Sequence, residues 1–349
     1  MRDLGLWLSY AGTPGENPMA NLTPPLAPGR SQQPPGLLEV LEARRVVGRH
    51  LSRTPLYAYP GLSALVGAEV WVKHENHQPI GAFKVRGGVN LLSQLSVDEK
   101  AAGVVTASTG NHGLSIAWAA RAFAVGATIC VPEGANPAKI NAIVGLGAEV
   151  VAYGADFDEA REHAEKLAAE RGSRYVHPGN EPALIAGVAT ETLEILEDQP
   201  GIDAIVVPVG GGSGAAGACI VAKAIRPSIQ VIAVQSSAAP AAYKSWCARA
   251  LVEDQMATFA EGLATRTAFD LPQRVLWGLL DDFVLVSDEE LRVAVRAMIE
   301  YTRNLVEPAG AASLAAAVRL GGRLSGRRVA LICTGGNISS AQLRDILDH

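Results

Sequence analysis

The sequence lacks several features that mark common classes of protein. Its 349 residues contain only four cysteines, Cys130, Cys219, Cys247 and Cys333, with no CxxC pair and no spacing typical of a metal site. Reduced thiols are therefore expected rather than a disulfide framework or a cysteine-bound metal. No block of Lys or Arg interrupts the chain, and the net charge is -5. Nucleic acid is therefore not an expected partner.

Long apolar runs are also missing. No span of about 18 apolar residues offers a membrane helix, and the N-terminal apolar patch is too short and interrupted for a signal peptide. A cytoplasmic protein without membrane contact is therefore expected. No GxSxG elbow is present, which argues against the commonest type of hydrolase. His74 and His77 form an HxxH pair, but no further ligands follow at a recognisable spacing, so no metal site is predicted.

The chain is long enough and apolar enough to bury a large core. With 349 residues, of which 48% are hydrophobic, it is expected to fold into two lobes. Residues 1–36 contain seven of the 20 prolines, which is typical of a flexible tail. The folded part is expected to begin near Leu37.

Strands and helices alternate through most of the folded part. Continuous apolar runs, each followed by a helical pattern, occur at 103–107, 127–132, 149–154, 203–210, 230–235 and 327–334. The alternation predicts a parallel sheet, and the continuous apolar strands predict helices on both faces. The resulting fold is doubly wound α/β, in which ligands bind beyond the carboxyl ends of strands.

One loop beyond a predicted strand, 210–214, consists of four glycines and a serine. Glycines allow several backbone N–H groups to converge on an anion at a helix N-terminus, so the loop is predicted to bind phosphate. A turn needed only for packing is the alternative. Gly212, Gly214 and Gly217 also match GxGxxG, but the next strand ends in Gln235 where a dinucleotide site needs an acid. A monophosphate cofactor is favoured over NAD.

Three further stretches carry candidate chemistry. The loop 108–112 offers hydroxyls and amides at a helix N-terminus, suited to a carboxylate or a ring oxygen, although an ordinary helix cap is also possible. The loop 334–337 places a hydroxyl after a strand and is ambiguous by itself. Lys84 follows the apolar run 79–83, where desolvation favours a neutral, nucleophilic amine. The alternative is a structural cation at the start of a helix.

Taken together, and in their order along the chain, Lys84 and the three loops resemble the fold-type-II pyridoxal-phosphate enzymes, in particular the threonine/serine dehydratases and serine racemase. The resemblance covers roughly residues 37–345. Four motifs carry it: Ala82–Gly87 matches SFKxRG, Ser108–His112 matches S-x-GNH, Gly210–Ser213 matches the tetraglycine phosphate loop, and Thr334–Asn337 matches SGGN.

The resemblance implies two lobes of open parallel sheets, like those of the tryptophan synthase β subunit. It implies a large cofactor-binding domain, 37–95 and 181–349, a small substrate-side domain, 96–180, and pyridoxal 5'-phosphate held by Lys84 as a Schiff base. The implied cofactor site comprises Phe83, Lys84, Asn111, Gly210, Gly211, Gly212, Ser213, Gly214, Glu307 and Thr334. The implied substrate site comprises Ser108, Thr109, Gly110, Asn111, His112, Gly179, Gly262 and Arg266.

Some positions depart from the family pattern. Thr109 stands where the racemase has a second catalytic serine, so Thr109 joins Lys84 as a candidate catalytic residue. Gly179 is expected to leave room for a bulky substrate side chain, which Arg266 could approach. Gln235 and Ala241 replace acids that bind a divalent cation, so that metal site is expected to be lost.

These observations predict a dehydratase that converts threonine or serine to a 2-oxo acid and ammonia. The alternatives are a racemase of the serine racemase type and a dehydratase for a bulkier substrate such as phenylserine. A catalytically silent binding protein and an oxidoreductase are disfavoured. The resemblance further implies an amino-acid substrate and a homo-oligomer, either a dimer or a tetramer. No feedback control by an appended domain is expected.

Overall fold

A computed structural model describes residues 33–108, 110–135, 137–155 and 157–348. Residues 33–349 form one compact unit by their contacts. Most of the expected Pro-rich tail lies outside the described residues. The first described element is α1 (Leu37–His50). None of the helices in the described ranges is both long and apolar enough to cross a membrane.

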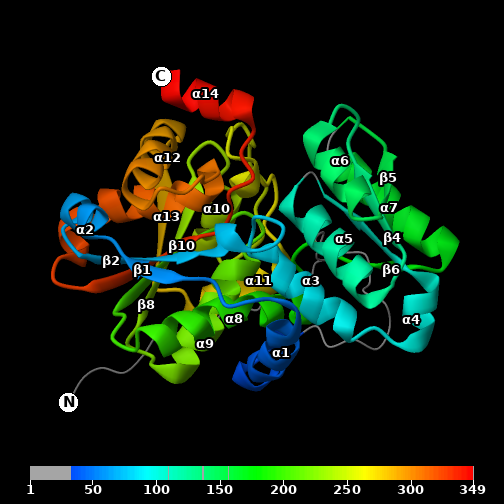
Figure 1. Cartoon of the computed structure of the whole chain (residues 1–349), viewed down its shortest axis with the longest axis horizontal. Coiled ribbons are helices and arrows are strands. Elements are labelled where there is room, and N and C mark those ends of the chain that lie inside the picture. The colour runs from blue at the N-terminus through cyan, green and yellow to red at the C-terminus, as the bar shows by residue number, and fades with distance from the viewer. Residues whose placement is uncertain (1–32, 109, 136, 156, 349) are drawn as a thin grey trace, which may run out of the picture. The chain divides into compact units, whose positions relative to one another are not determined.

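The larger of two sheets has six strands (Figure 1). In spatial order they are β1 (Leu56–Ala58), β2 (Glu69–His74), β10 (Arg328–Cys333), β7 (Ala204–Pro208), β8 (Gln230–Ser236) and β9 (Asp282–Val286). All neighbours are parallel except β1 and β2, which pair antiparallel. The prediction of a parallel sheet is therefore confirmed for the centre of the sheet, and β1 forms an antiparallel edge.

Helices cover both faces of this sheet, as the continuous apolar strands predicted. Ile205 and Val207 of β7 pack into one apolar cluster, whereas Ala204 and Val206 pack into another on the opposite face. The first cluster includes residues of α1, α8 (Pro182–Asp198), α9 (Ser213–Ile225) and α11 (Asp270–Leu279). The second includes α2 (Pro60–Val66), α12 (Asp288–Thr302), α13 (Pro308–Leu320) and α14 (Ser340–Asp348).

The smaller sheet has four strands, all parallel. In spatial order they are β5 (Glu149–Ala152), β4 (Ala127–Val131), β3 (Val104–Ala107) and β6 (Arg174–Tyr175). Residues of α3 (Lys84–Ser93), α5 (Asn111–Phe123) and α6 (Pro137–Gly145) pack on one face, and residues of α7 (Phe157–Arg171) pack on the other. The remaining helices are α4 (Val97–Ala102), α10 (Ala241–Ala248) and three short 3-10 turns, Glu75–His77, Glu261–Leu263 and Gly321–Leu324.

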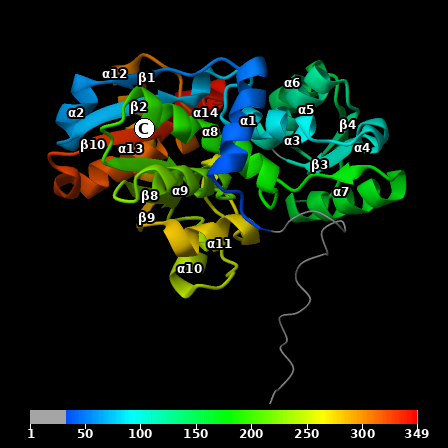
Figure 2. The ribbon, with the colours of Figure 1, turned by 90° about the horizontal axis from the view of Figure 1, so that it is seen from below.

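The stretch 236–326 contains elements that the strand–helix alternation did not predict. It holds α10 to α13 and the edge strand β9. In Figure 2, α10 and α11 lie together beside β9. These two helices interrupt the simple alternation because no strand lies between them, only the long segment 249–269, whose one helical part is the short 3-10 turn Glu261–Leu263.

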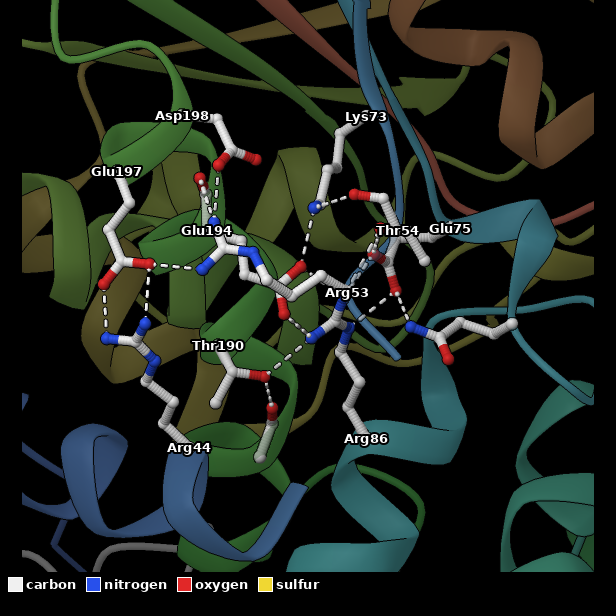
Figure 3. A network of polar contacts seen from close by, with 12 residues as sticks. Arg44, Arg53, Thr54, Lys73, Glu75, Arg86, Thr190, Glu194, Glu197 and Asp198 are labelled. Carbon is white, nitrogen blue, oxygen red and sulfur yellow. Dashed lines mark hydrogen bonds and ion pairs between the residues drawn. The ribbon is translucent and has the colours of Figure 1, made fainter. Parts of the chain in front are cut away.

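A buried ionic network holds the first turns of α3 against α8 (Figure 3). The Arg86 guanidinium donates to both Glu75 carboxyl oxygens at 2.7 and 2.8 Å and to both Glu194 oxygens at 2.8 Å. Lys73 Nζ donates to Glu194 at 2.6 Å and to the Thr54 carbonyl at 2.7 Å. The network therefore balances two cations with two carboxylates.

Glu191 lies next to this network but takes no part in it. It is fully buried, and neither carboxyl oxygen has a hydrogen-bond partner among the described residues. Burial and the nearby Glu75 raise the pKa of Glu191 well above its usual value. Since the network is already balanced in charge, Glu191 is held as a neutral acid.

Candidate active site

Lys84 is the first residue of α3, and its backbone is fixed on both sides. Phe83 N donates to the Thr334 carbonyl at 3.0 Å, and Ser115 Oγ of α5 donates to the Lys84 carbonyl at 2.6 Å. The Lys84 amine donates to Ser213 Oγ at 3.0 Å and to the Pro178 carbonyl at 3.5 Å. The predicted reactive lysine and the predicted phosphate loop therefore meet.

The surroundings of Lys84 favour the neutral amine. Desolvation by burial lowers the pKa of Lys84 to about 8. The Nζ atom lies 5.3 Å from the centroid of the Phe83 ring. The lowered pKa makes the neutral amine, the form that a nucleophile or base requires, more populated near neutral pH than in an ordinary lysine.

The glycine-rich loop 210–214 connects β7 to α9 in a conformation that requires glycine. Gly212 has a φ of 87° and caps α9. A Cβ at position 210 would lie 2.3 Å from the Gly262 carbonyl oxygen, and one at 211 would lie 2.3 Å from the Phe269 ring. The loop thus brings the N–H groups of the first turn of α9, which have no partner within the helix, beside Lys84, where they form a cradle for an anion.

The loop 108–112 follows β3 and opens α5, as its position predicted. Ser108 Oγ accepts from Gly110 N at 3.1 Å, which folds the loop back on itself. The His112 ring is buried, with Nε2 3.0 Å from Thr106 Oγ1. Desolvation, Lys84 and His177 lower the pKa of His112 well below its usual value, so the ring is neutral. Thr109 lies outside the described residues.

Asn111 belongs to a polar chain that links α5 to two other segments. Its amide Nδ2 donates to Glu307 Oε1 at 2.8 Å, and its Oδ1 accepts from Asn337 Nδ2 at 2.7 Å. Asn337 also donates to the Ile80 carbonyl at 2.8 Å. Sequence patterns pointed to Asn111 and Glu307 but gave Asn337 no role, although it closes the TGGN motif.

Glu307 has an unusual ionisation for a carboxyl group. Burial raises its pKa from 4.5 to about 7, although Lys139 and the Asn111 amide oppose the shift. Its Oε1 also leaves no space at Gly335, where a Cβ would lie 2.4 Å away. Glu307 is therefore a group that changes charge near neutral pH at the wall of the site.

We expect Glu307→Gln to alter how stability depends on pH. The folded protein holds the Glu307 proton more tightly than the unfolded chain, so this group stabilises the fold below pH 4.5. That contribution is lost as pH rises to about 7. In urea unfolding, the free energy of unfolding of the variant should rise relative to that of the wild type by up to about 3 kcal/mol between pH 4.5 and 7.5. A difference that does not change with pH would contradict the assignment.

The expected open space at Gly179 does not exist, because the ring of Phe269 fills it. A Cβ at position 179 would lie 2.3 Å from Phe269 Cδ2. Gly262 lies between Gly210 and Glu307, so it belongs to the same wall. Arg266 has 47% side-chain exposure and lies 3.6 Å from Asp158 of α7. Its proposed approach to the substrate stays a prediction.

Gln235 has a structural partner in this protein. It is buried, and its Oε1 accepts from Tyr243 N at 3.0 Å in the first turn of α10. The side chain therefore anchors α10 to the end of β8.

The residues present suit pyridoxal phosphate. The cradle at the N-terminus of α9 suits a phosphate monoester, and an amine with a lowered pKa lies 3.0 Å from the hydroxyl of the same loop. Asn111 and Thr334 come from two other strand ends that lead into the same region. Lys84, the loop 210–214 and Asn111 are therefore the groups that could hold such a cofactor.

Comparison with known proteins agrees with this geometry. Residues 47–335 match the model of a family described as pyridoxal-phosphate dependent enzyme. The L-threonine ammonia-lyase of Thermotoga maritima is 37% identical over 89% of this chain and 78% of its own length. A threonine deaminase isoform from Solanum lycopersicum superposes with a TM-score of 0.85 and 30% identity, covering 94% of this chain and 99% of its own. Serine racemase from Dictyostelium discoideum superposes with a TM-score of 0.83 and 32% identity, covering 88% of this chain and 100% of its own.

The chain belongs to the family of pyridoxal-phosphate dependent enzymes. Its architecture is that of fold type II, as the resemblance implied. Within the family it is a threonine dehydratase-like enzyme, and its cofactor is pyridoxal phosphate.

The structure also reveals residues near the site that sequence patterns missed. Phe269 fills the space above two glycines of the site, and Glu191 lies 3.7 Å from where a Gly214 Cβ would be. Lys139 of α6 forms an ion pair with Glu261 and lies beside Gly110 of the loop 108–112. None of the three belongs to a recognisable motif, so only the fold could show where they lie.

Proposed function

We propose that this protein is an ammonia-lyase that converts a small β-hydroxy-α-amino acid, threonine or serine, to a 2-oxo acid and ammonia. The observation that carries the proposal is the Lys84 amine, which has a lowered pKa and donates to Ser213 of the phosphate-binding loop. The Thermotoga maritima relative, named a threonine ammonia-lyase, supports this choice of reaction.

Several residues have separate roles in the proposed reaction. Lys84 would hold the cofactor, and its free amine would take the proton from the substrate Cα. The backbone N–H groups of 108–112, at the N-terminus of α5, bind the substrate carboxylate. Pyridoxal phosphate, when bound, supplies the electron sink for the charge left at Cα. The β-hydroxyl would leave as water with one proton, which balances the proton taken from Cα. Hydrolysis of the resulting enamine, through its imine form, would consume one water and release the 2-oxo acid and ammonia.

The neighbouring residues keep Lys84 suited to this role. As a base it must be neutral, and its pKa of about 8 lies close to working pH. Phe83 packs its ring beneath Gly214, where it shields the amine from water on that side. Asn111, held by Glu307 and Asn337, presents an amide that could contact the cofactor ring oxygen.

The proposal is tested with protein that has been reconstituted with pyridoxal phosphate. Release of 2-oxo acid is measured for the L and D forms of serine and threonine, together with ammonia. Equal amounts of both products from one of these amino acids are expected. Protein with bound cofactor that releases no 2-oxo acid from any of them would refute the lyase.

A racemase is the second candidate, because the serine racemase of Dictyostelium discoideum is 32% identical over 88% of this chain. Thr109 could donate a proton on the substrate face opposite Lys84. We expect Thr109→Ala to keep dehydration within about threefold while lowering racemisation by at least about tenfold, a range typical of a lost acid–base group. Chiral chromatography of recovered substrate measures the second rate. Loss of dehydration alone would contradict this role.

We further propose that the two domains divide the work. All six strands of the larger sheet fall within 37–95 and 181–349, and all four strands of the smaller sheet fall within 96–180. The first domain binds the cofactor, and the second binds the substrate carboxylate. The protein is proposed to act as a homo-oligomer in the cytoplasm, where its four free cysteines would stay reduced.

A further inference from the structure

We propose that Phe269 is the residue that sets the size of the substrate side chain. Its ring closes one end of the site and restricts the β-substituent to hydrogen or methyl. This inference rests on the proposed lyase activity and names the substrate class more narrowly. It also reverses the expectation that Gly179 leaves room for an aromatic substrate.

The ring of Phe269 lies over two glycines from different segments. A Cβ on Gly179 would lie 2.3 Å from Phe269 Cδ2, and a Cβ on Gly211 would lie 2.3 Å from Phe269 Cε2. Both distances are far below van der Waals contact, so neither position can carry a side chain while the ring is in place. The two glycines together form a seat for this one ring.

Further contacts hold the ring in that seat. It packs edge-on against His177, with centroids 4.8 Å apart and an interplanar angle of 82°. His177 Nδ1 accepts from Gly179 N at 3.0 Å and from Asn180 N at 2.9 Å. Asn180 Oδ1 in turn accepts from Leu271 N at 3.0 Å, in the first turn of α11. Phe269, which precedes α11, is therefore tied to the loop it covers.

The seat lies beside the reactive amine. Lys84 Nζ contacts the Pro178 carbonyl, next to Gly179, and Ser213, two residues after Gly211. A substrate whose Cα proton is taken by Lys84 must place its Cβ one bond further on, among the groups that surround this amine. Phe269 is half-buried. The glycines therefore cover one part of its ring, and another part stays accessible.

The test compares kcat/KM for threonine and phenylserine in the reconstituted enzyme. Wild type is expected to prefer threonine strongly. Phe269→Ala should raise the ratio of phenylserine to threonine kcat/KM by at least about tenfold, since pocket volume alone changes such ratios by about 10- to 200-fold. Phe269→Leu, which keeps apolar contact with the glycines, should raise it less.

Phe123 offers a matched control. It is also half-buried and also packs on a histidine, with its ring centroid 4.8 Å from that of His50, at the far end of α5. Phe123→Ala removes the same ring and a comparable contact but should leave the ratio unchanged. An equal change in both variants, or none in Phe269→Ala, overturns the proposal, as does a wild type that accepts phenylserine readily.

A second pair of variants tests the seat without turnover. Gly179→Ala should lower Tm in the wild-type background, because the new Cβ meets the ring, but should be tolerated together with Phe269→Ala. Gly179→Phe with Phe269→Ala should bring the ratio of specificities back towards threonine. Additive effects on Tm would overturn the seat. A wild type that releases no 2-oxo acid from serine, threonine or phenylserine overturns the lyase and this inference together, whereas activity with unchanged ratios overturns this inference alone.

Discussion

Lys84→Ala is expected to abolish turnover and to remove the absorbance band that pyridoxal phosphate gains when bound to a lysine. The amine serves as both the cofactor attachment point and the base, so kcat should fall by at least about 10⁴-fold, beyond the usual effect of losing a general base alone. Absorbance spectra after dialysis and 2-oxo acid release measure the two effects.

Two control variants show whether the effect comes from the amine chemistry of Lys84, rather than from its charge or from the loss of any lysine near the site. Lys84→Arg keeps a cation that cannot deprotonate, and it should be as inactive as the alanine variant. Lys139 is a second lysine near the site, 3.7 Å from where a Gly110 Cβ would lie. Lys139→Ala should keep the absorbance band. A band that survives in Lys84→Ala but disappears in Lys139→Ala would show that Lys139, and not Lys84, holds the cofactor.

Arg86→Leu is expected to have the largest effect on stability. It leaves the Glu75 carboxylate buried without its cation and removes both bonds from Arg86 to Glu194. Breaking one side of a buried ion pair costs about 3–5 kcal/mol. Urea unfolding followed by circular dichroism should show a loss of this size.

An exposed ion pair provides the comparison. Lys166 and Glu170 lie 3.9 Å apart on α7, with side chains 74% and 58% exposed. Lys166→Ala should change the unfolding free energy by less than about 0.5 kcal/mol. Glu75→Gln, a milder change in the same buried network, should fall between the two. A loss below about 1 kcal/mol for Arg86→Leu would show that Lys73 and the remaining groups rearrange to compensate.

The sequence predicted the parts of the fold that short segments encode. The loop 210–214 follows a buried strand and opens a helix, and four glycines in five residues are more than a simple turn requires. Local patterns likewise pointed to the loop 108–112, which follows a strand and opens a helix, and to Lys84, which follows an apolar run. Apolar continuity in β7 predicted coverage of both faces, because each residue of that strand packs on one side or the other.

The remaining features depend on contacts between distant segments. Gly179 resembles an empty position until Phe269, 90 residues later, is seen to fill it. Glu191 resembles a surface residue of a helix, but α8 is packed by α1, α3 and α9, which bury it completely. β1 has too few residues for its direction to be predicted, and the irregular segment 249–269 hid the elements around it.

The reactive amine and the central structural cation share one turn of one helix. Lys84 and Arg86 are two residues apart in α3, so the first points into the site while the second enters the buried network. The turn cannot open locally without breaking those ion pairs, so its amide protons should exchange with solvent only when the whole domain unfolds. Retention of the cofactor therefore reports on global unfolding, and partial melting should not release it.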